Sequence, residues 1–111
     1  MSNNITAAPG VSTKAGTYNG NGADNLGVAH GLGSIPKLVQ ITEPTGSRTA
    51  FLFVVNGIVF LLNLVNGTNV VNVGYAAITL PTKTNFYVGE AGSYTISMNG
   101  AGQNYYWTAW A

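Results

Sequence analysis

The chain has few side chains that could carry out catalysis. Its 111 residues include one histidine, His30, three carboxylic acids and no cysteine. A serine triad would have to combine His30 with Asp24 and a serine, and no Gly-x-Ser-x-Gly turn is present to expose such a serine. Acid–base catalysis needs titratable groups, which are scarce here. We therefore expect no catalytic residue and no enzymatic activity, and we expect His30 to bond the adjacent glycine-rich turn.

Metal and cofactor sites are not indicated either. Asp24, Glu43 and Glu90 are far apart in the sequence, whereas metal sites use several ligands at fitted spacing. One residue from three symmetry-related copies could still ligate an ion, but nothing selects that residue. Neither Lys14 nor Lys37 follows the Gly-x-x-x-x-Gly spacing of a phosphate-binding loop. We expect no metal and no cofactor.

Aromatic residues gather near the C-terminus at Tyr105, Tyr106, Trp107 and Trp110. On a strand, Tyr105 and Trp107 share one face with Ala109, while Tyr106 and Trp110 share the other. One face is expected to fill the core, and the other to be exposed or to lie at an interface. Exposed Tyr and Trp side chains can bind sugars, bases or proteins. With core or interface packing as the alternative, the candidates for a partner or ligand surface are Tyr106, Trp110, Asn19 and Asn21.

The composition favours a chain that packs against other protein. Charged residues make up only 6% of the chain, against about 25% in an average soluble domain. The net charge is +1, which gives no strong field for nucleic acid or an anionic membrane. Monomeric proteins usually keep their net charge away from zero. We expect an assembly, with neither nucleic acid nor membrane as a partner.

The elements that position these residues are short strands separated by Asn-Gly turns. Asn-Gly pairs begin at Asn19, Asn21, Asn56, Asn66 and Asn99, and this pair is the strongest short-range hairpin signal. The expected strands are 14–18, 25–30, 36–43, 50–55, 58–65, 69–80 (as one strand, or two broken near Gly74), 85–88, 93–98 and 104–110. The pattern predicts an all-β chain, an antiparallel sandwich or barrel of about eight strands.

The central hairpin around Asn56-Gly57 is apolar at every position of 51–55 and 58–62. A half-exposed antiparallel strand should alternate between apolar and polar residues, so both faces of this hairpin are expected to be dry. One face can fill the core, and the other needs cover from a loop, a terminus or a neighbouring subunit. The residues assigned to the core or an oligomer interface are Phe51, Phe53, Phe60 and Leu62.

The first thirteen residues show no strand period. We assign 1–13 to a flexible N-terminal arm, which is either a disordered tail or a segment that orders on a partner, and 14–111 to the sandwich domain. The segment has no basic region followed by an apolar one, so no secretory leader is expected. The most apolar stretch, 50–65, is too short to span a membrane.

The order of several motifs resembles a family of β-sandwich domains in virion proteins of tailed bacteriophages, found in tail fibres and small surface proteins. These motifs are Gly16-Thr17-Tyr18-Asn19-Gly20-Asn21-Gly22, Val28-Ala29-His30-Gly31-Leu32-Gly33, Ile35-Pro36-Lys37-Leu38-Val39, Asn85-Phe86-Tyr87-Val88-Gly89 and the closing Gly102, Tyr105-Tyr106-Trp107 and Ala109. The arrangement is also similar to H-type lectin domains, which trimerise and bind sugars. The resemblance implies a homotrimer.

Two roles follow from the resemblance. A fibre tip normally follows a long stalk, which the short segment 1–13 does not provide, so the first expectation is a capsid decoration protein. Such a protein is made in the host cytoplasm, sits as a trimer on the virion surface and clamps the major capsid protein. The N-terminal arm would anchor it to the shell. The alternative is a receptor-binding or glycan-binding module of tail-fibre or lectin type, with a host-surface glycan as partner.

Overall fold

The computed structural model describes residues 12–43, 48–65, 69–91 and 94–111. These residues form eight strands and no helix, as the sequence predicts, and consequently no helix that could cross a membrane. The strands are β1 (Thr13–Asn19), β2 (Leu26–Ala29), β3 (Leu38–Glu43), β4 (Arg48–Val55), β5 (Ile58–Val65), β6 (Asn69–Tyr75), β7 (Asn85–Val88) and β8 (Asn104–Trp110).

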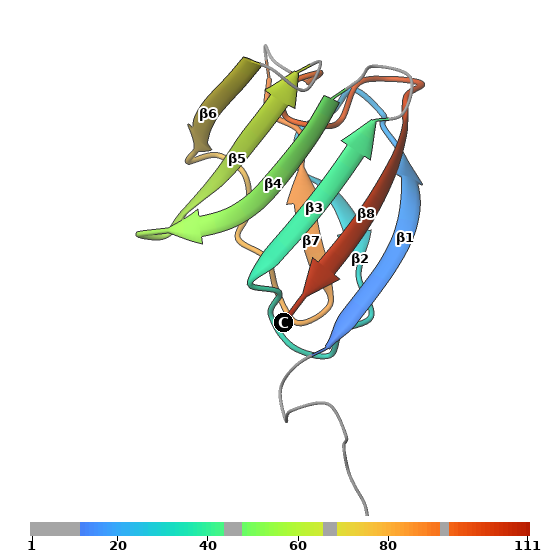
Figure 1. The fold of residues 1–111 in the computed structure, drawn as a ribbon, viewed down its shortest axis with the longest axis vertical. Helices are drawn as coiled ribbons and strands as arrows, with labels where there is room; N and C mark the ends of the chain where they lie inside the picture. Colours follow the sequence, from blue (N-terminus) through green and yellow to red (C-terminus); the bar gives the residue numbers. More distant parts are fainter. Residues whose placement is uncertain (1–11, 44–47, 66–68, 92–93) are drawn as a thin grey trace, which may run out of the picture.

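The strands form two antiparallel sheets. Six of them make one sheet in the order β1-β8-β3-β4-β5-β6, and β2 pairs with β7 in a smaller sheet. Figure 1 shows the small sheet behind β3 and β8 of the large one. The architecture is all-β and consistent with a sandwich of two unequal layers.

The core lies between the two sheets and follows the pleat. Burial in β3 alternates along the strand, with Val39 and Ile41 fully buried and Leu38 and Gln40 partly exposed. This is the period of two that a strand imposes on its side chains. In β8 the same alternation buries Tyr105, Trp107 and Ala109, which confirms that this set fills the core.

An aromatic cluster fills the space between β1, β7 and β8. Tyr18 stacks on Tyr105 with a centroid separation of 4.9 Å, and Phe86 meets Trp107 edge to face at 5.5 Å. Gly16, opposite Trp107 in the β1–β8 register, makes room for the indole, because a Cβ there would lie 2.8 Å from Trp107 Cζ2. The glycine of this early motif therefore has a packing role.

The turn between β4 and β5 confirms the hairpin predicted from Asn56-Gly57. Asn56 has a φ of 51° and Gly57 a φ of 75°, and a type I′ turn requires positive φ at both of these positions. It is the only Asn-Gly pair in the described ranges with both angles positive. The other described pairs lie in longer connections, so Asn-Gly overpredicted two-residue hairpins.

Two strand predictions need correction. The segment expected to be a strand at 93–98 is a series of turns over its described residues 94–98. Met98 has a φ of 63° and its N–H donates to Thr95 O, so the backbone curls instead of extending. The long strand expected over 69–80 ends at Tyr75. Of the predicted arm, residues 1–11 lie outside the described residues, and β1 begins at Thr13.

Candidate functional site

The face of the large sheet that points away from the small sheet carries no charge in β1, β8, β3, β4 and β5. Cross-strand partners share a face, so the register identifies its members. We call this surface the outer face; in these five strands it consists of Thr13, Ala15, Thr17, Asn19, Asn104, Tyr106, Thr108, Trp110, Leu38, Gln40, Thr42, Thr49, Phe51, Phe53, Val55, Ile58, Phe60, Leu62 and Leu64.

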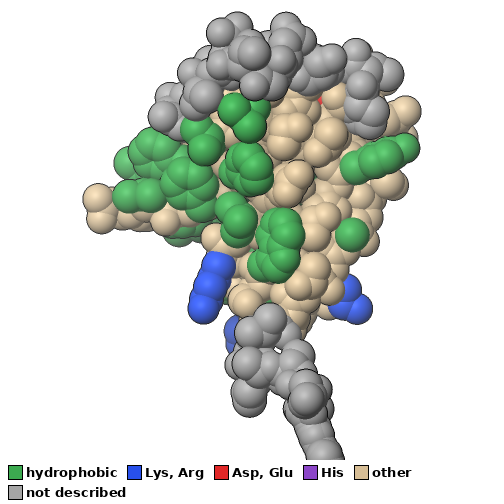
Figure 2. Space-filling model, in the orientation of Figure 1, with side chains coloured by type: hydrophobic (Ala, Val, Ile, Leu, Met, Phe, Trp, Pro, Cys, Tyr) green, Lys and Arg blue, Asp and Glu red, His purple; other side chains and the backbone are tan. Residues whose placement is uncertain are grey.

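The charged residues of these strands occupy the alternate positions. Lys14, Glu43 and Arg48 share the register of the core residues and belong to the opposite side of the sheet. Figure 2 views the outer face, and the lysine and arginine side chains visible there lie at the lower end, away from the sheet's centre. A sheet face exposed to water normally carries polar and charged residues.

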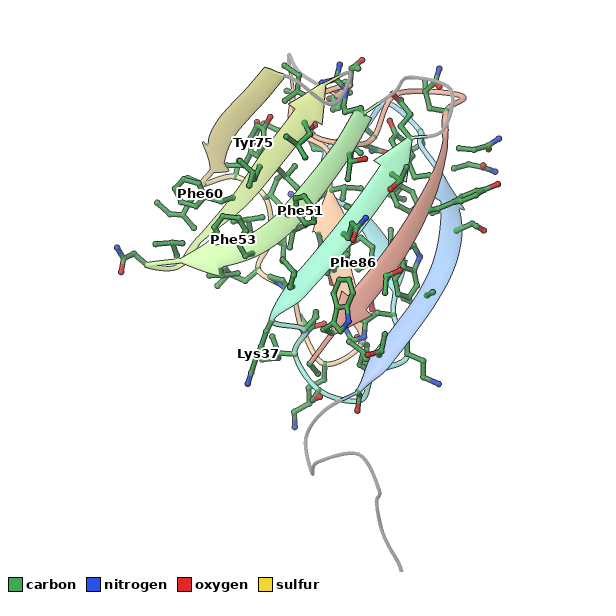
Figure 3. All side chains as sticks on the ribbon, in the orientation of Figure 1. Lys37, Phe51, Phe53, Phe60, Tyr75 and Phe86 are labelled. Carbon is green, nitrogen blue, oxygen red and sulfur yellow. The ribbon has the colours of Figure 1, made fainter. Side chains whose placement is uncertain are left out.

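The part of the outer face over β4 and β5 is apolar. The predicted residues Phe51, Phe53, Phe60 and Leu62 all lie on it, half-buried, outside the core between the sheets. Phe53 and Phe60 are direct partners across the hairpin, and their rings stack with centroids 6.0 Å apart (Figure 3). The structure therefore brings the four predicted residues together on one surface.

The other face of the same hairpin explains its unbroken apolar sequence. Leu52, Val59 and Leu61 are buried in the core, with exposures of 1%, 0% and 0%. The intervening residues Phe51, Phe53 and Phe60 face outward and are partly exposed. One apolar face of the hairpin is thus buried in the core, and the opposite face remains partly exposed.

The part of the outer face over β1 and β8 is polar and slightly hollow. Tyr106 is 57% exposed, and its partners in the register are Thr17 on β1 and Thr42 on β3. These side chains, with Gln40 and Thr108, line a shallow concavity of about 430 Å³. It combines an aromatic ring with hydroxyl and amide groups and has no charge.

The four predicted ligand-surface residues do not form one site. Trp110 shares the outer face with Tyr106 but lies four residues along β8, about 13 Å away. Asn19 lies near Tyr106, because it pairs with Asn104 two residues earlier on β8. Asn21 Oδ1 accepts from Asn99 Nδ2 at 2.8 Å and from Ala23 N–H at 3.1 Å, so this side chain shapes its own loop.

His30 is 2% exposed and bonds the glycine-rich turn, as predicted. Leu32 N–H donates to His30 Nδ1 at 3.0 Å, and Nε2 lies 2.8 Å from Thr82 O. Because an amide N–H only donates and a carbonyl only accepts, the ring is the Nε2–H tautomer. Both ring nitrogens therefore bind backbone groups and join the 30–33 turn to the segment before β7.

The acidic residues are closer in space than the sequence suggested. Asp24 accepts from the Tyr94 hydroxyl at 2.8 Å, and Glu90 also lies near Tyr94. The hydrogen bond to Asp24 is the main reason that the pKa of Tyr94 is raised. Glu43 is buried near Tyr105. Across the described ranges, no group of three potential ligands gathers around one point.

Sequence reasoning missed the polar neighbours of Tyr106. Thr17, Gln40 and Thr42 come from two strands that are distant from β8 in the sequence and adjacent to it in the sheet. Their alternation with buried residues indicated that they face outward, but only the pairing of β8 between β1 and β3 places them beside Tyr106. Comparison of the chain with protein-family models, curated proteins and solved structures finds no match.

Proposed function

We propose that this chain is a structural module without enzymatic activity that assembles with copies of itself through the outer face, as a homotrimer. The observation that carries the proposal is the apolar, charge-free surface around Phe53 and Phe60. The trimeric number comes from the resemblance described above. The self-association rests on the physical chemistry of the exposed sheet.

Burial of this surface supplies the driving force. Apolar area removed from water contributes about 25 cal/mol per Å² before the costs of association. Six strands of about seven residues present a face of roughly 600 Å² at ordinary strand spacing, close to the ~800 Å² per partner of a stable interface. The outer face carries no charged side chain in β1, β8, β3, β4 and β5. Burial of these five strands therefore requires no desolvation of an ion.

A finer proposal places the assembly on the virion of a tailed bacteriophage, as a capsid decoration protein bound to the major capsid protein. It rests on the ordered motifs quoted from the sequence alone, without support from the comparisons. The test adds the purified protein to capsids that lack it and images them by cryo-electron microscopy. Density at local symmetry axes would support the proposal; bare shells, or density only at the tail, would count against it.

A second candidate function, recognition of a host-surface glycan, is favoured by the concavity around Tyr106. An exposed ring can stack on the apolar face of a sugar, and uncharged hydroxyl and amide groups can bond its hydroxyls. A glycan array probed with the wild type and Tyr106→Ala tests this role. Binding that is lost in Tyr106→Ala and kept in Tyr106→Phe would support it. No binding to any glycan, or equal binding by all three proteins, would reject it.

A further inference from the structure

The charged side chains are divided between the two ends of the sandwich. Thr13, Trp110 and Leu38 form one row across β1, β8 and β3, and Lys14 and Lys37 are each adjacent to that row. Lys83 precedes β7 and lies at the same end. Leu80 and Pro81, which come just before it, line a groove together with Lys37. All three lysine side chains are exposed. We call this the basic end.

The Asp and Glu side chains lie at the opposite end. β3 begins directly after Lys37 and ends at Glu43. Glu43 therefore lies at the opposite end of the strand from Lys37. Asp24 lies in the connection that follows β1, and Asn25 N–H donates to Gly89 O, which places Glu90 beside it. Every Asp and Glu of the chain is within the described residues, so no carboxylate side chain neutralises the lysines of the basic end.

The basic end also carries an apolar groove. Its volume is about 420 Å³, and its lining consists of Ile35, Pro36, Lys37, Val54, Leu80 and Pro81. Ile35 is 55% exposed, Leu80 44% and Val54 42%. Figure 3 shows Lys37 at the lower end, below the hairpin that bears Phe53.

Hydrogen bonds hold both walls of the groove. Lys37 N–H donates to Trp110 O at 2.7 Å, which fixes the Ile35–Lys37 wall to β8. Behind the Leu80–Pro81 wall, His30 Nε2 donates to Thr82 O and Thr82 N–H donates to Asn85 O. The two prolines add rigidity, because each has a fixed φ. A partner would therefore meet a preformed site and would not have to order it.

We propose that the basic end is a docking site for an acidic segment of another protein that inserts an apolar side chain into this groove. Leucine-sized side chains match the apolar lining, and carboxylates on either side of the inserted residue would lie near Lys37 and Lys83. The concave shape fits a protruding side chain better than a flat lipid surface. The groove is distinct from the surface of the proposed self-association, because none of its lining residues belongs to the outer face.

The test measures binding of three fluorescent peptides to the full chain by fluorescence polarisation. The first peptide is Glu-Asp-Glu-Leu-Leu-Glu-Asp-Glu, the second replaces both leucines with serine, and the third replaces all acids with lysine. We expect binding of the first peptide only, with affinity that falls as salt rises. No binding of the first peptide at about 1 mM, where even a weak docking site would be occupied, or equal binding of the third, would overturn the proposal.

Variants locate the site. Leu80→Ser and Lys37→Glu are expected to weaken binding by about tenfold or more, while Lys14→Glu, which changes the net charge equally but lies outside the groove, should retain most of it. Thermal melts confirm that each variant folds. Unchanged binding by Leu80→Ser would refute the groove. Peptide binding seen only after removal of residues 1–11 would show that this segment of the chain occupies the groove. Binding only to phosphatidylserine vesicles would show that the basic end binds a lipid surface. Either result would reject the proposal.

Discussion

The ring of Phe60 lies over Gly74 on the neighbouring strand. The two residues are direct partners between β5 and β6, and a Cβ at position 74 would lie 3.0 Å from Phe60 Cζ. The absence of a side chain at Gly74 thus lets Phe60 lie flat and stack on Phe53. This contact shapes the apolar surface through which we propose that the protein associates.

Gly74→Val is expected to weaken self-association with little loss of monomer stability. A valine suits an extended backbone, and the atom it displaces is the tip of a ring that can move. The ring would then protrude and disturb the flat face. Sedimentation velocity should show a larger dissociated fraction, and the free energy of unfolding of the monomer in urea should change by less than about 1 kcal/mol. Unchanged association would show that the position of the Phe60 ring is unimportant.

Gly57→Ala should destabilise the fold by about 1–2 kcal/mol, because alanine in the left-handed region incurs a backbone penalty. No atom lies within 4 Å of a Cβ at Gly57, so a steric contact would not contribute. Asn56→Gly is the matched control, since glycine accepts the φ of 51° at that position. Urea denaturation measures both. Equal stabilities for Gly57→Ala and the wild type would contradict a type I′ turn at the tip.

The two hydrogen bonds of His30 can be removed separately. Asparagine can replace Nδ1 as the acceptor for Leu32 N–H, and glutamine can replace Nε2 as the donor to Thr82 O. Phenylalanine keeps the ring but leaves both backbone groups unpaired, at about 1–3 kcal/mol each. We expect His30→Phe to lose more stability in urea denaturation than either His30→Asn or His30→Gln. The reverse order would rule out the structural role.

Alkaline pH should destabilise the protein through its buried tyrosines. Burial raises the pKa of Tyr105 to about 12, although Gly100 N–H, which donates to its hydroxyl, acts in the opposite direction. Burial also raises the pKa of Tyr18. The folded state therefore keeps protons that the unfolded chain loses near about pH 10. Stability is complete below that pH and falls as the pH approaches the folded pKa.

Urea midpoints measured between about pH 8 and about pH 11.5 test this dependence. The midpoint should be nearly flat at first and then decline, and Tyr105→Phe should decline less steeply because it removes one of the two titrating groups. A wild-type midpoint that stays constant to the highest pH would show that these hydroxyls ionise as freely as in the unfolded chain.

Much of the fold could be predicted from local patterns. The strands at 58–65, 85–88 and 104–110 have the observed bounds, because turn residues flank each of them and their composition favours extended backbone. The strand predicted at 93–98 is wrong, although Tyr94, Thr95 and Ile96 have strand propensity. The turns of this segment are held in part by bonds to distant residues, such as the Tyr18 hydroxyl to Met98 O, which no local pattern contains.

The candidate surfaces could be predicted only in part. Period-two alternation placed Tyr106 and Trp110 on one side of β8, and the unbroken apolar run marked the hairpin of Phe53 and Phe60. The sheet order was not predictable, because β8 from the end of the chain inserts between β1 and β3. That insertion creates the concavity around Tyr106, and long-range packing likewise creates the groove at the basic end.

Sedimentation equilibrium of the wild type and Phe60→Asp tests the central claim most directly. At about 100 µM, where micromolar association is nearly complete, the wild type should have three times the chain mass of 11.5 kDa. Phe60→Asp should sediment as a folded monomer, because dimerisation or trimerisation would bury its carboxylate, whereas Tyr106→Ser on the polar part of the face should change the mass less. A monomeric wild type, or a Phe60→Asp variant with the wild-type mass, would contradict self-association through the outer face.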